Sequence, residues 1–169
     1  MRDQGEVRYS IAMNHVITAL ALILLLPGSA LAEMTGPVNA IEGDIIEIRS
    51  ERVRLFGIDA PEPEQSCAIL GKSIDCGHIA KTALMDLTAG ATVVCRPTGT
   101  KRRGLAVAIC SVDGFDISEN MVHTGWALAD PEDGSRYLAK QREAKRAKRG
   151  LWRGTFTLPW RWRKERDAK

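Results

Sequence analysis

An uninterrupted apolar run near the start of the chain limits which residues can take part in a fold. The run covers Val16–Leu26, basic residues precede it, and a Pro-Gly-Ser break follows it. A run of this length is too short to cross a bilayer as a helix, which needs about 20 residues. Ala30-Leu31-Ala32 then offers the small residues that a signal peptidase reads, so we expect cleavage directly after it. Residues 1–32 are therefore predicted to be a signal peptide, whether translation starts at Met1 or at Met13.

Four cysteines lie beyond the expected cleavage point, and they indicate the compartment as well as the cross-links. An even number of cysteines in a small exported domain is typical of disulfides. A zinc site is the alternative, but the chain has no Cys-x-x-Cys pair and no histidine at ligand spacing. Three pairings are possible in principle; we favour Cys67–Cys76, closing a local loop, and Cys95–Cys110, joining two neighbouring strands. The protein is accordingly expected to be secreted or periplasmic, with no membrane anchor once the signal is removed.

Charge is distributed unevenly along the predicted mature chain. Residues 33–135 contain 9 Lys or Arg and 16 Asp or Glu, whereas residues 136–169 contain 13 and 3. A basic segment can bind a polyanion by releasing counterions, although most such runs are solvated helix faces. The acidic body is more informative, because nucleic-acid binding alone would not favour it. Carboxylates gathered around a cation would explain it.

Hydrophobic patterning predicts strands early in the chain and helices between and after them. Stretches rich in apolar and β-branched residues predict strands at Val38–Ile48 (with a turn at Gly43-Asp44), Val53–Ile58, Thr92–Arg96 and Leu105–Cys110. The segment from Pro61 to Cys76 is expected to be a loop, and a polar loop over 98–103 joins the last two strands.

Three helices are expected. The first carries a stripe that Gly90 ends, made of Ile79, Ala83, Leu84 and Leu87. Ser118 is expected to cap a second helix that runs to His123 and closes at Gly125. The third starts near Ser135 and is predicted to present Tyr137, Leu138, Ala144, Ala147 and Leu151 inward. Strands accompanied by helices in this order predict an α+β fold, a small β-barrel flanked by helices.

Acidic and basic side chains gather at the predicted ends of these strands. They are Glu42 and Asp44 at a turn, Arg54 within a strand, Asp59 and Glu62 after that strand, and Arg103 before another. Separately, each is an ordinary turn or surface residue. Together they are what phosphodiester hydrolysis requires: oxygen ligands for a hard cation such as Ca²⁺, a carboxylate base for the attacking water, and guanidinium groups for phosphate oxygens.

Residues 53–62, which read VRLFGIDAPE, resemble the signature of the staphylococcal nuclease (thermonuclease) family. Further segments agree with the family in order, at Gly43-Asp44, Gly71 to Ala80, RGLA of 103–106, GWA of 125–127 and residues 145–152. The resemblance extends from Val38 to Trp152. It implies a five-stranded OB-fold β-barrel flanked by three helices, in a domain of residues 33–152 followed by a basic, tryptophan-containing tail of residues 153–169.

The same resemblance implies a Ca²⁺-dependent endonuclease. The expected substrates are single-stranded or denatured DNA and RNA, cut to leave 3′-phosphate ends by a monomeric enzyme. Carried over by motif position, the calcium ligands would be Asp44, Asp59 and the carbonyl of Ala60. Glu62 would be the general base, and Arg54 and Arg103 would hold the phosphate.

Four features depart from the family's pattern. Glu42 stands where the family prefers Asp, and Ile45 replaces a Thr. Ala60 replaces the Thr that some members carry, although only its main-chain oxygen is needed, and Lys101-Arg102 precede Arg103 where Tyr-Gly is usual. Loss of the tyrosine could weaken stacking, worth ~1–3 kcal/mol per base, and the added basic residues could compensate through phosphate contacts. The alternative to an active enzyme is a catalytically weak or inactive OB-fold binding protein, with exopolysaccharide (succinoglycan) biosynthesis as one context.

Trp160 and Trp162 alternate with arginines in the tail. Interleaved aromatic and basic residues could stack on bases. The tail could equally fold back over the barrel as a latch, which is the interpretation we favour.

Overall fold

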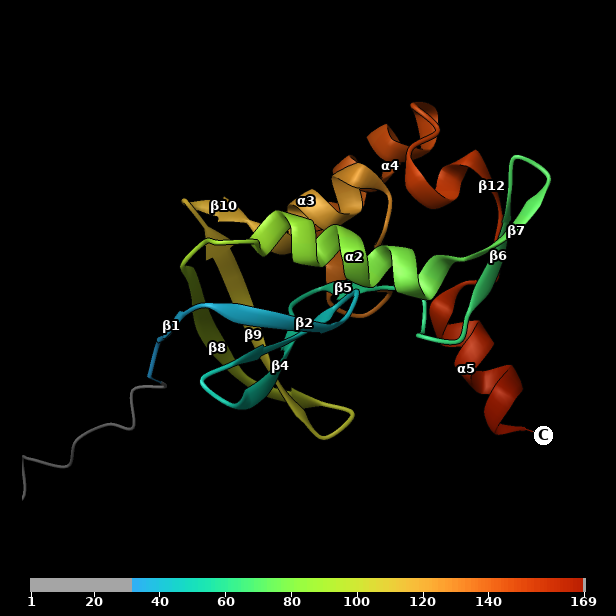
Figure 1. Cartoon of the computed structure of the whole chain (residues 1–169). Helices are drawn as coiled ribbons and strands as arrows, with labels where there is room; N and C mark the ends of the chain where they lie inside the picture. The colour runs from blue at the N-terminus through green and yellow to red at the C-terminus, as the bar shows by residue number, and fades with distance from the viewer. Residues whose placement is uncertain (1–31, 169) are drawn as a thin grey trace, which may run out of the picture. The chain divides into compact units, whose positions relative to one another are not determined.

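The computed structural model describes residues 32–168, so the predicted signal peptide, apart from Ala32, lies outside the described residues. The principal sheet has the strand order β1-β8-β9-β4-β3-β2, and β10 pairs with β9 (Figure 1). Its strands are β1 (Met34–Gly36), β2 (Val38–Glu42), β3 (Ile45–Ile48), β4 (Glu51–Leu55), β8 (Val93–Arg102), β9 (Leu105–Val112) and β10 (Phe115–Asp116). Neighbouring strands are antiparallel, except that β4 runs parallel to β9.

Two clusters of buried side chains support the domain. The large cluster lies between the principal sheet and the helices and includes Ile46, Ile48, Val53, Leu55, Leu84, Ile117 and Met121. The small cluster consists of Cys67, Ile69, Cys76, Leu128 and Leu151. Trp126 packs against both clusters and so connects them.

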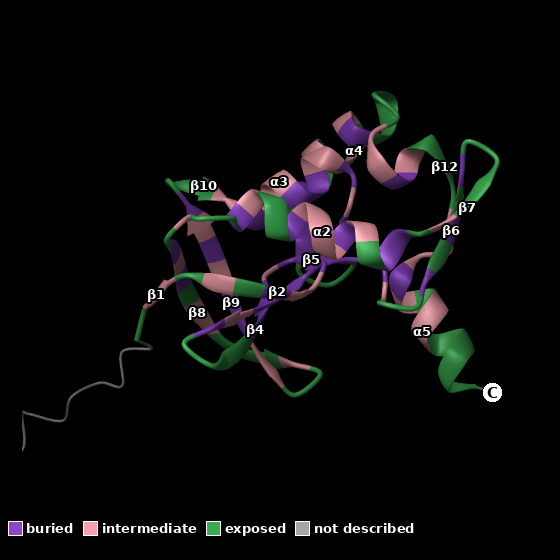
Figure 2. Ribbon diagram, viewed as in Figure 1, coloured by how far each residue is buried: buried purple, intermediate pink, exposed green. Residues whose placement is uncertain are grey.

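Helix α2 (Cys76–Thr88) covers the large cluster. Its buried residues include Ala80, Leu84 and Thr88, which are four positions apart and therefore share one face. Figure 2 shows buried and exposed positions alternating along this helix. The predicted stripe is thus confirmed at Leu84, while Ile79, Ala83 and Leu87 flank the buried face and are half-buried.

Helix α3 (Ile117–Thr124) begins two residues earlier than predicted. The side chain of Asp116 accepts a hydrogen bond from Glu119 N at 3.1 Å, so Asp116 is the N-cap. The prediction of Ser118 as cap is wrong, because Ser118 is fully buried within the helix. Gly125 ends the helix in the left-handed region with φ 79°, as predicted.

The third predicted helix is broken into η1 (Gly134–Tyr137), α4 (Leu138–Arg146) and η2 (Gly150–Arg153). Tyr137, Ala144 and Leu151 are buried as predicted, but the prediction is wrong for Leu138 and Ala147, which are exposed. Consecutive helical residues point about 100° apart, so the position after buried Tyr137 turns toward solvent.

Two segments predicted as loops are paired strands. Residues 61–76 contain the hairpin β6 (Ser66–Ile69) and β7 (Lys72–Asp75), with β12 (Gly154–Thr155) on the other edge of β6. β8 and β9 continue to a tight turn at Arg103-Gly104, in place of the loop over 98–103. Both hairpin turns, Leu70-Gly71 and Arg103-Gly104, have two consecutive residues with positive φ, which matches the right-handed twist of the flanking strands.

Both predicted disulfides are present. Cys95 and Cys110 are directly opposite each other in the β8–β9 register, with their Cα atoms 4.1 Å apart. Cys67 of β6 is joined to Cys76, the first residue of α2, so the hairpin is fixed to the start of the helix.

The strands and helices agree with the predicted α+β, OB-type fold. The two ends of the strand order, β1 and β2, are separated only by Pro37 and pair with β8 and β3 respectively, so one continuous segment joins both ends of the sheet, as in a barrel. One detail differs: residues 32–168 contain four α-helices where three were predicted. The fourth, α5 (Pro159–Asp167), forms from the tail. None of the helices in residues 32–168 is long and apolar enough to span a membrane.

We expect thiol labelling of the denatured, unreduced protein to give no adduct, and labelling after reduction to give four. Replacing Cys95 and Cys110 together with alanine should lower the free energy of unfolding by about 3 kcal/mol, because the bridge closes a loop of roughly 15 residues. Mass spectrometry and urea unfolding measure these outcomes. Adducts without reduction would contradict the pairing.

Candidate active site

Asp44 is fixed by a closely packed turn between β2 and β3. A Cβ at Gly43 would lie 2.7 Å from Ala60 Cβ and 2.8 Å from Ala80 Cβ, so only glycine fits there. The carbonyl of Asp44 accepts a hydrogen bond from Leu55 N at 2.9 Å. The turn therefore brings Asp44 beside both Ala60 and β4.

Arg54 projects from β4 into this region and is almost fully buried. Its Nη1 donates a short hydrogen bond to Asp44 Oδ2. Its Nε is buried and has no hydrogen-bond partner in the described part of the chain. A buried guanidinium nitrogen without a partner is costly, and it leaves a donor available for an anion.

Asp59 is held in the two-residue strand β5 (Ile58–Asp59), where it lies opposite Leu128 of β11 (Leu128–Ala129). Asp59 is only 2% exposed. Because β5 follows β4 after a single turn, Asp59 is placed near Arg54 and Asp44 by chain connection as well as by pairing.

Arg103 connects the three carboxylates that the sequence predicts to act together. Its Nη2 lies 4.0 Å from Asp44 Oδ2 and 3.7 Å from Asp59 Oδ1, and its Nη1 lies 3.3 Å from Glu62 Oε1. The side chain extends from the β8–β9 turn and is 36% exposed. The structure thus brings together all five side chains that the sequence assigned to catalysis or metal binding.

Negative charge is incompletely compensated at this site. The pKa of Asp44 is raised to about 7, because burial and the neighbouring Asp59 together outweigh the lowering effect of Arg54. Burial and the neighbouring Glu62 also raise the pKa of Glu42. Perturbed carboxylates that share one location are typical of functional sites.

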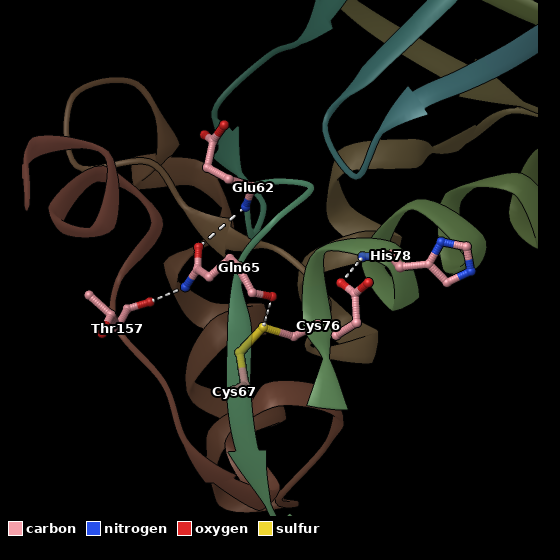
Figure 3. Close-up of a disulfide and its surroundings, with 7 residues drawn as sticks. Glu62, Gln65, Cys67, Cys76, His78 and Thr157 are labelled. Atoms are coloured by element: carbon pink, nitrogen blue, oxygen red, sulfur yellow. Dashed lines mark hydrogen bonds between the residues drawn. A yellow bond between two sulfur atoms is a disulfide. The ribbon is translucent and has the colours of Figure 1, made fainter. Parts of the chain in front are cut away.

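The backbone of Glu62 is held by a buried glutamine that sequence reasoning missed. The Oε1 of Gln65 accepts from Glu62 N at 3.3 Å, and its Nε2 donates to Thr157 O at 2.7 Å. Figure 3 shows this side chain between Glu62 and Thr157, next to the Cys67–Cys76 disulfide. Gln65 therefore links the Glu62 loop to the segment that leads into α5.

The start of α2 also fixes Glu62. A Cβ at Gly77 would lie 1.9 Å from the carbonyl oxygen of Glu62, so the helix and the Glu62 loop can approach only at a glycine. The main-chain oxygen of Gln65 accepts hydrogen bonds from Cys76 N at 3.1 Å and Gly77 N at 3.3 Å.

A third arginine, Arg163 of α5, reaches the same carboxylates. Its Nη1 donates to Asp59 Oδ1 at 2.9 Å and to Glu62 Oε1 at 2.5 Å, and its Nη2 donates to Asp59 Oδ2 at 2.5 Å. The sequence offered only the alternation of arginine and tryptophan in the tail as a signal, which does not say which arginine would point inward.

The basic residues before Arg103 do not reach the carboxylate cluster. Arg102 pairs with Asp130 at 2.7 Å, Glu132 at 3.3 Å and Asp133 at 3.5 Å, and so anchors the loop after β11. The expected compensation through phosphate contact is therefore unsupported for Arg102. Lys101 is exposed.

The donor set suits a hard cation, although the described residues contain no closed cluster of three or more metal-binding side chains. Asp44 and Asp59 supply buried carboxylate oxygens around the same Arg103 nitrogen. Ala60 is buried directly against the Asp44 turn. Oxygen ligands with excess negative charge are what Ca²⁺ prefers.

Comparisons with known proteins identify the family of the chain. Residues 52–154 match the family described as Staphylococcal nuclease homologue. The chain is 34% identical to "Succinoglycan biosynthesis protein ExoI" of Rhizobium meliloti (strain 1021) over 158 residues, 90% of this chain and 83% of the relative. It is 31% identical to an "Uncharacterized endonuclease" of Escherichia coli O157:H7 over 134 residues, 75% and 82% of the two chains. It is 30% identical to "Micrococcal nuclease" of Shigella flexneri over 173 residues, 90% and 92%.

We expect Gln65→Met to lower the free energy of unfolding by about 2 kcal/mol, since each buried group that loses its partner costs ~1–3 kcal/mol. Gln141→Met is the matched control, because within residues 32–168 the side chain of Gln141 forms a single hydrogen bond, accepted from Ala129 N at 2.8 Å. Urea unfolding of both variants in the presence of a chelator measures the difference. Equal losses would contradict the linking role of Gln65.

Proposed function

This chain belongs to the staphylococcal nuclease family, and on that premise we propose that it is a Ca²⁺-dependent endonuclease that hydrolyses phosphodiester bonds of DNA and RNA. The observation that carries the proposal is the position of Arg103, within 4.0 Å of Asp44, Asp59 and Glu62 at once. A guanidinium group and three carboxylates in one place can bind a phosphate, hold a cation and accept a proton.

Glu62 is proposed as the general base. Its carboxylate is the least buried of the three, with 11% of the side chain exposed against 3% for Asp44 and 2% for Asp59. Solvent therefore reaches Glu62 more readily than its neighbours. A positioned carboxylate that takes the proton of the attacking water typically contributes ~10²–10⁴-fold to the rate.

Arg54 and Arg103 are proposed to bind the phosphate oxygens. Arg54 is fixed by Asp44 and retains the buried Nε donor that has no partner in residues 32–168. Arg103 is partly exposed and spreads its contacts over distances of 3.3–4.0 Å, so it can exchange them for phosphate oxygens. Both groups would stabilise the charge that develops as the phosphorus is attacked.

Asp44, Asp59 and the carbonyl of Ala60 are proposed as the calcium ligands. When bound, the cation polarises a phosphoryl oxygen and offsets the negative charge of the carboxylates. The raised pKa of Asp44 supports this assignment, because burial beside Asp59 leaves that carboxylate short of compensating charge.

Export to an oxidising compartment is part of the proposal. The two disulfides support it, since such bridges persist in secreted and periplasmic proteins. The predicted signal peptide of residues 1–32, the monomeric state and a preference for single-stranded or denatured substrates complete the proposed description.

A nucleic-acid- or glycan-binding protein without activity is the second candidate. Its support is the 34% identity to a relative named for succinoglycan biosynthesis, together with two arginines that already occupy Glu62. This candidate predicts salt-sensitive binding without cleavage, and binding that Glu62→Gln leaves unchanged.

We expect the protein to release acid-soluble fragments from denatured DNA in Ca²⁺ and to lose this activity with a chelator. Glu62→Gln should lower the rate by roughly 10²–10⁴-fold, because it removes the base without changing the size of the side chain. Glu47→Gln, a carboxylate of β3 that pairs with Arg52, is the control and should keep full activity. Activity that survives chelation or the Glu62 substitution would exclude the mechanism.

A further inference from the structure

Helix α5 lies beyond the residues that match the family, yet the domain holds it firmly. The family match ends at residue 154, and α5 covers Pro159–Asp167. Gln65 binds the main-chain oxygen of Thr157, and Pro159 at the start of the helix is buried. Figure 1 shows α5 at the end of the domain where α2 begins, below the β6–β7 hairpin.

Trp160 completes this attachment. It packs against the small cluster, together with Phe156 and Leu158. Trp162 is half-buried and carries the guanidinium of Arg166 over its ring, 5.0 Å from the centroid. The tail therefore folds back on the domain as the latch interpretation expected.

The anchored helix delivers Arg163 to the cluster with both terminal nitrogens engaged. The two nitrogens bind both carboxylate oxygens of Asp59, and Nη1 also binds Glu62. Partial burial opposes the charged form, but the hydrogen bonds with Asp59 and Glu62 raise the pKa of Arg163 above its usual value. Arg163 is therefore a fixed positive charge at this position.

Arg163 and a calcium ion require the same oxygens. A guanidinium fork uses the lone pair of each Asp59 oxygen that faces it, so a cation bound from that side must displace Arg163. The net charge of the cluster also favours exchange of Arg163 for a cation. Glu42, Asp44, Asp59 and Glu62 are the acidic members, and Arg54, Arg103 and Arg163 the basic ones. Exchanging the single charge of Arg163 for a divalent cation would balance the set.

We propose that Arg163 is a positioning residue of the active site that occupies Asp59 and Glu62 in the cation-free protein and is displaced when a divalent cation binds. The affinity for the cation is then set by competition with this guanidinium, and the Glu62 base is released in the same step. The proposal rests on the proposed function to the extent that it takes Asp59 as a cation ligand.

Arg103 and Arg163 differ in exposure and in contact distances, and these differences indicate different roles. Arg103 is 36% exposed and none of its contacts is shorter than 3.3 Å, so it can turn to a phosphate without a large loss. Arg163 is 17% exposed, and its bonds to Asp59 and Glu62 are 2.5–2.9 Å long. A phosphate could reach Arg163 only after the carboxylates had released it.

The direct test is titration of the oxidised protein with CaCl₂ by calorimetry. We expect Arg163→Gln to bind Ca²⁺ about tenfold more tightly than the parent protein, equivalent to ~1.4 kcal/mol. Arg163→Lys keeps the positive charge but cannot bind both oxygens of Asp59 as the guanidinium does. Its Ca²⁺ affinity should therefore lie between those of the parent protein and Arg163→Gln. Arg166→Gln is the matched control, because Arg166 is on the same helix and forms its ion pairs in residues 32–168 with Glu64 and Asp167, outside the carboxylate cluster.

Unfolding supplies a second readout that does not depend on activity. In chelator, Arg163→Gln should be less stable than the parent protein, because Asp59 and Glu62 lose the closer of their two guanidinium partners. Saturating Ca²⁺ should stabilise the variant more than the parent, since tighter binding to the folded state gives a larger increment. If saturating Ca²⁺ raised the free energy of unfolding of the variant and of the parent protein equally, the proposal would be overturned.

Separate outcomes distinguish this inference from the proposed function. Tighter Ca²⁺ binding by Arg163→Gln supports the competition even if the parent protein hydrolyses no DNA. Unchanged Ca²⁺ affinity overturns it even if the parent protein is an active nuclease. A lower rate at saturating Ca²⁺ with unchanged affinity would identify Arg163 as a phosphate-binding residue instead and would also overturn it.

Discussion

The buried ion pair between Arg54 and Asp44 is the interaction on which the site depends. Removing either partner would leave a buried charge uncompensated, at a cost of ~3–5 kcal/mol. The pair is fixed because Leu55 N holds the carbonyl of Asp44, and Arg54 is the preceding residue of the same strand. The other charged groups lie around this pair. Asp59 follows β4 after one turn, and Arg103 reaches Asp44 from the β8–β9 hairpin. Two packed clusters and two disulfides stabilise the domain against the cost of gathering these charges.

Most of the site could be predicted from the sequence because its residues lie in short motifs at strand ends. Asp44, Arg54, Asp59 and Glu62 are separated by few residues, so strand alternation and turn position indicate their neighbourhood. Arg103 required the resemblance to a family, since spacing alone does not show that the β8–β9 turn faces β5. The disulfides were predicted because both bridges join segments that are close along the chain.

Contacts across long stretches of chain were missed. Arg163 reaches Asp59 over 104 residues, and Gln65 reaches Thr157 over 92 residues. No pattern of neighbouring residues predicts these two contacts, because nothing in the sequence distinguishes a buried glutamine or an inward-pointing arginine from an exposed one. The error at Ser118 has a related cause: its capping propensity was real, but tertiary packing buried it and left Asp116 to cap the helix. Arg102 was interpreted as a substrate contact, whereas three nearby carboxylates bind it.

The division of the interior into two clusters has a mechanical consequence for the site. Asp44 and Arg54 are carried by strands of the large cluster, whereas Arg163 is carried by the helix that Trp160 attaches to the small one, and Glu62 is fixed to Gln65 beside the Cys67–Cys76 bridge. The charged residues of the site are therefore supported by two different clusters, and Trp126 packs against both. Any shift of one cluster relative to the other would change the distances between these charges.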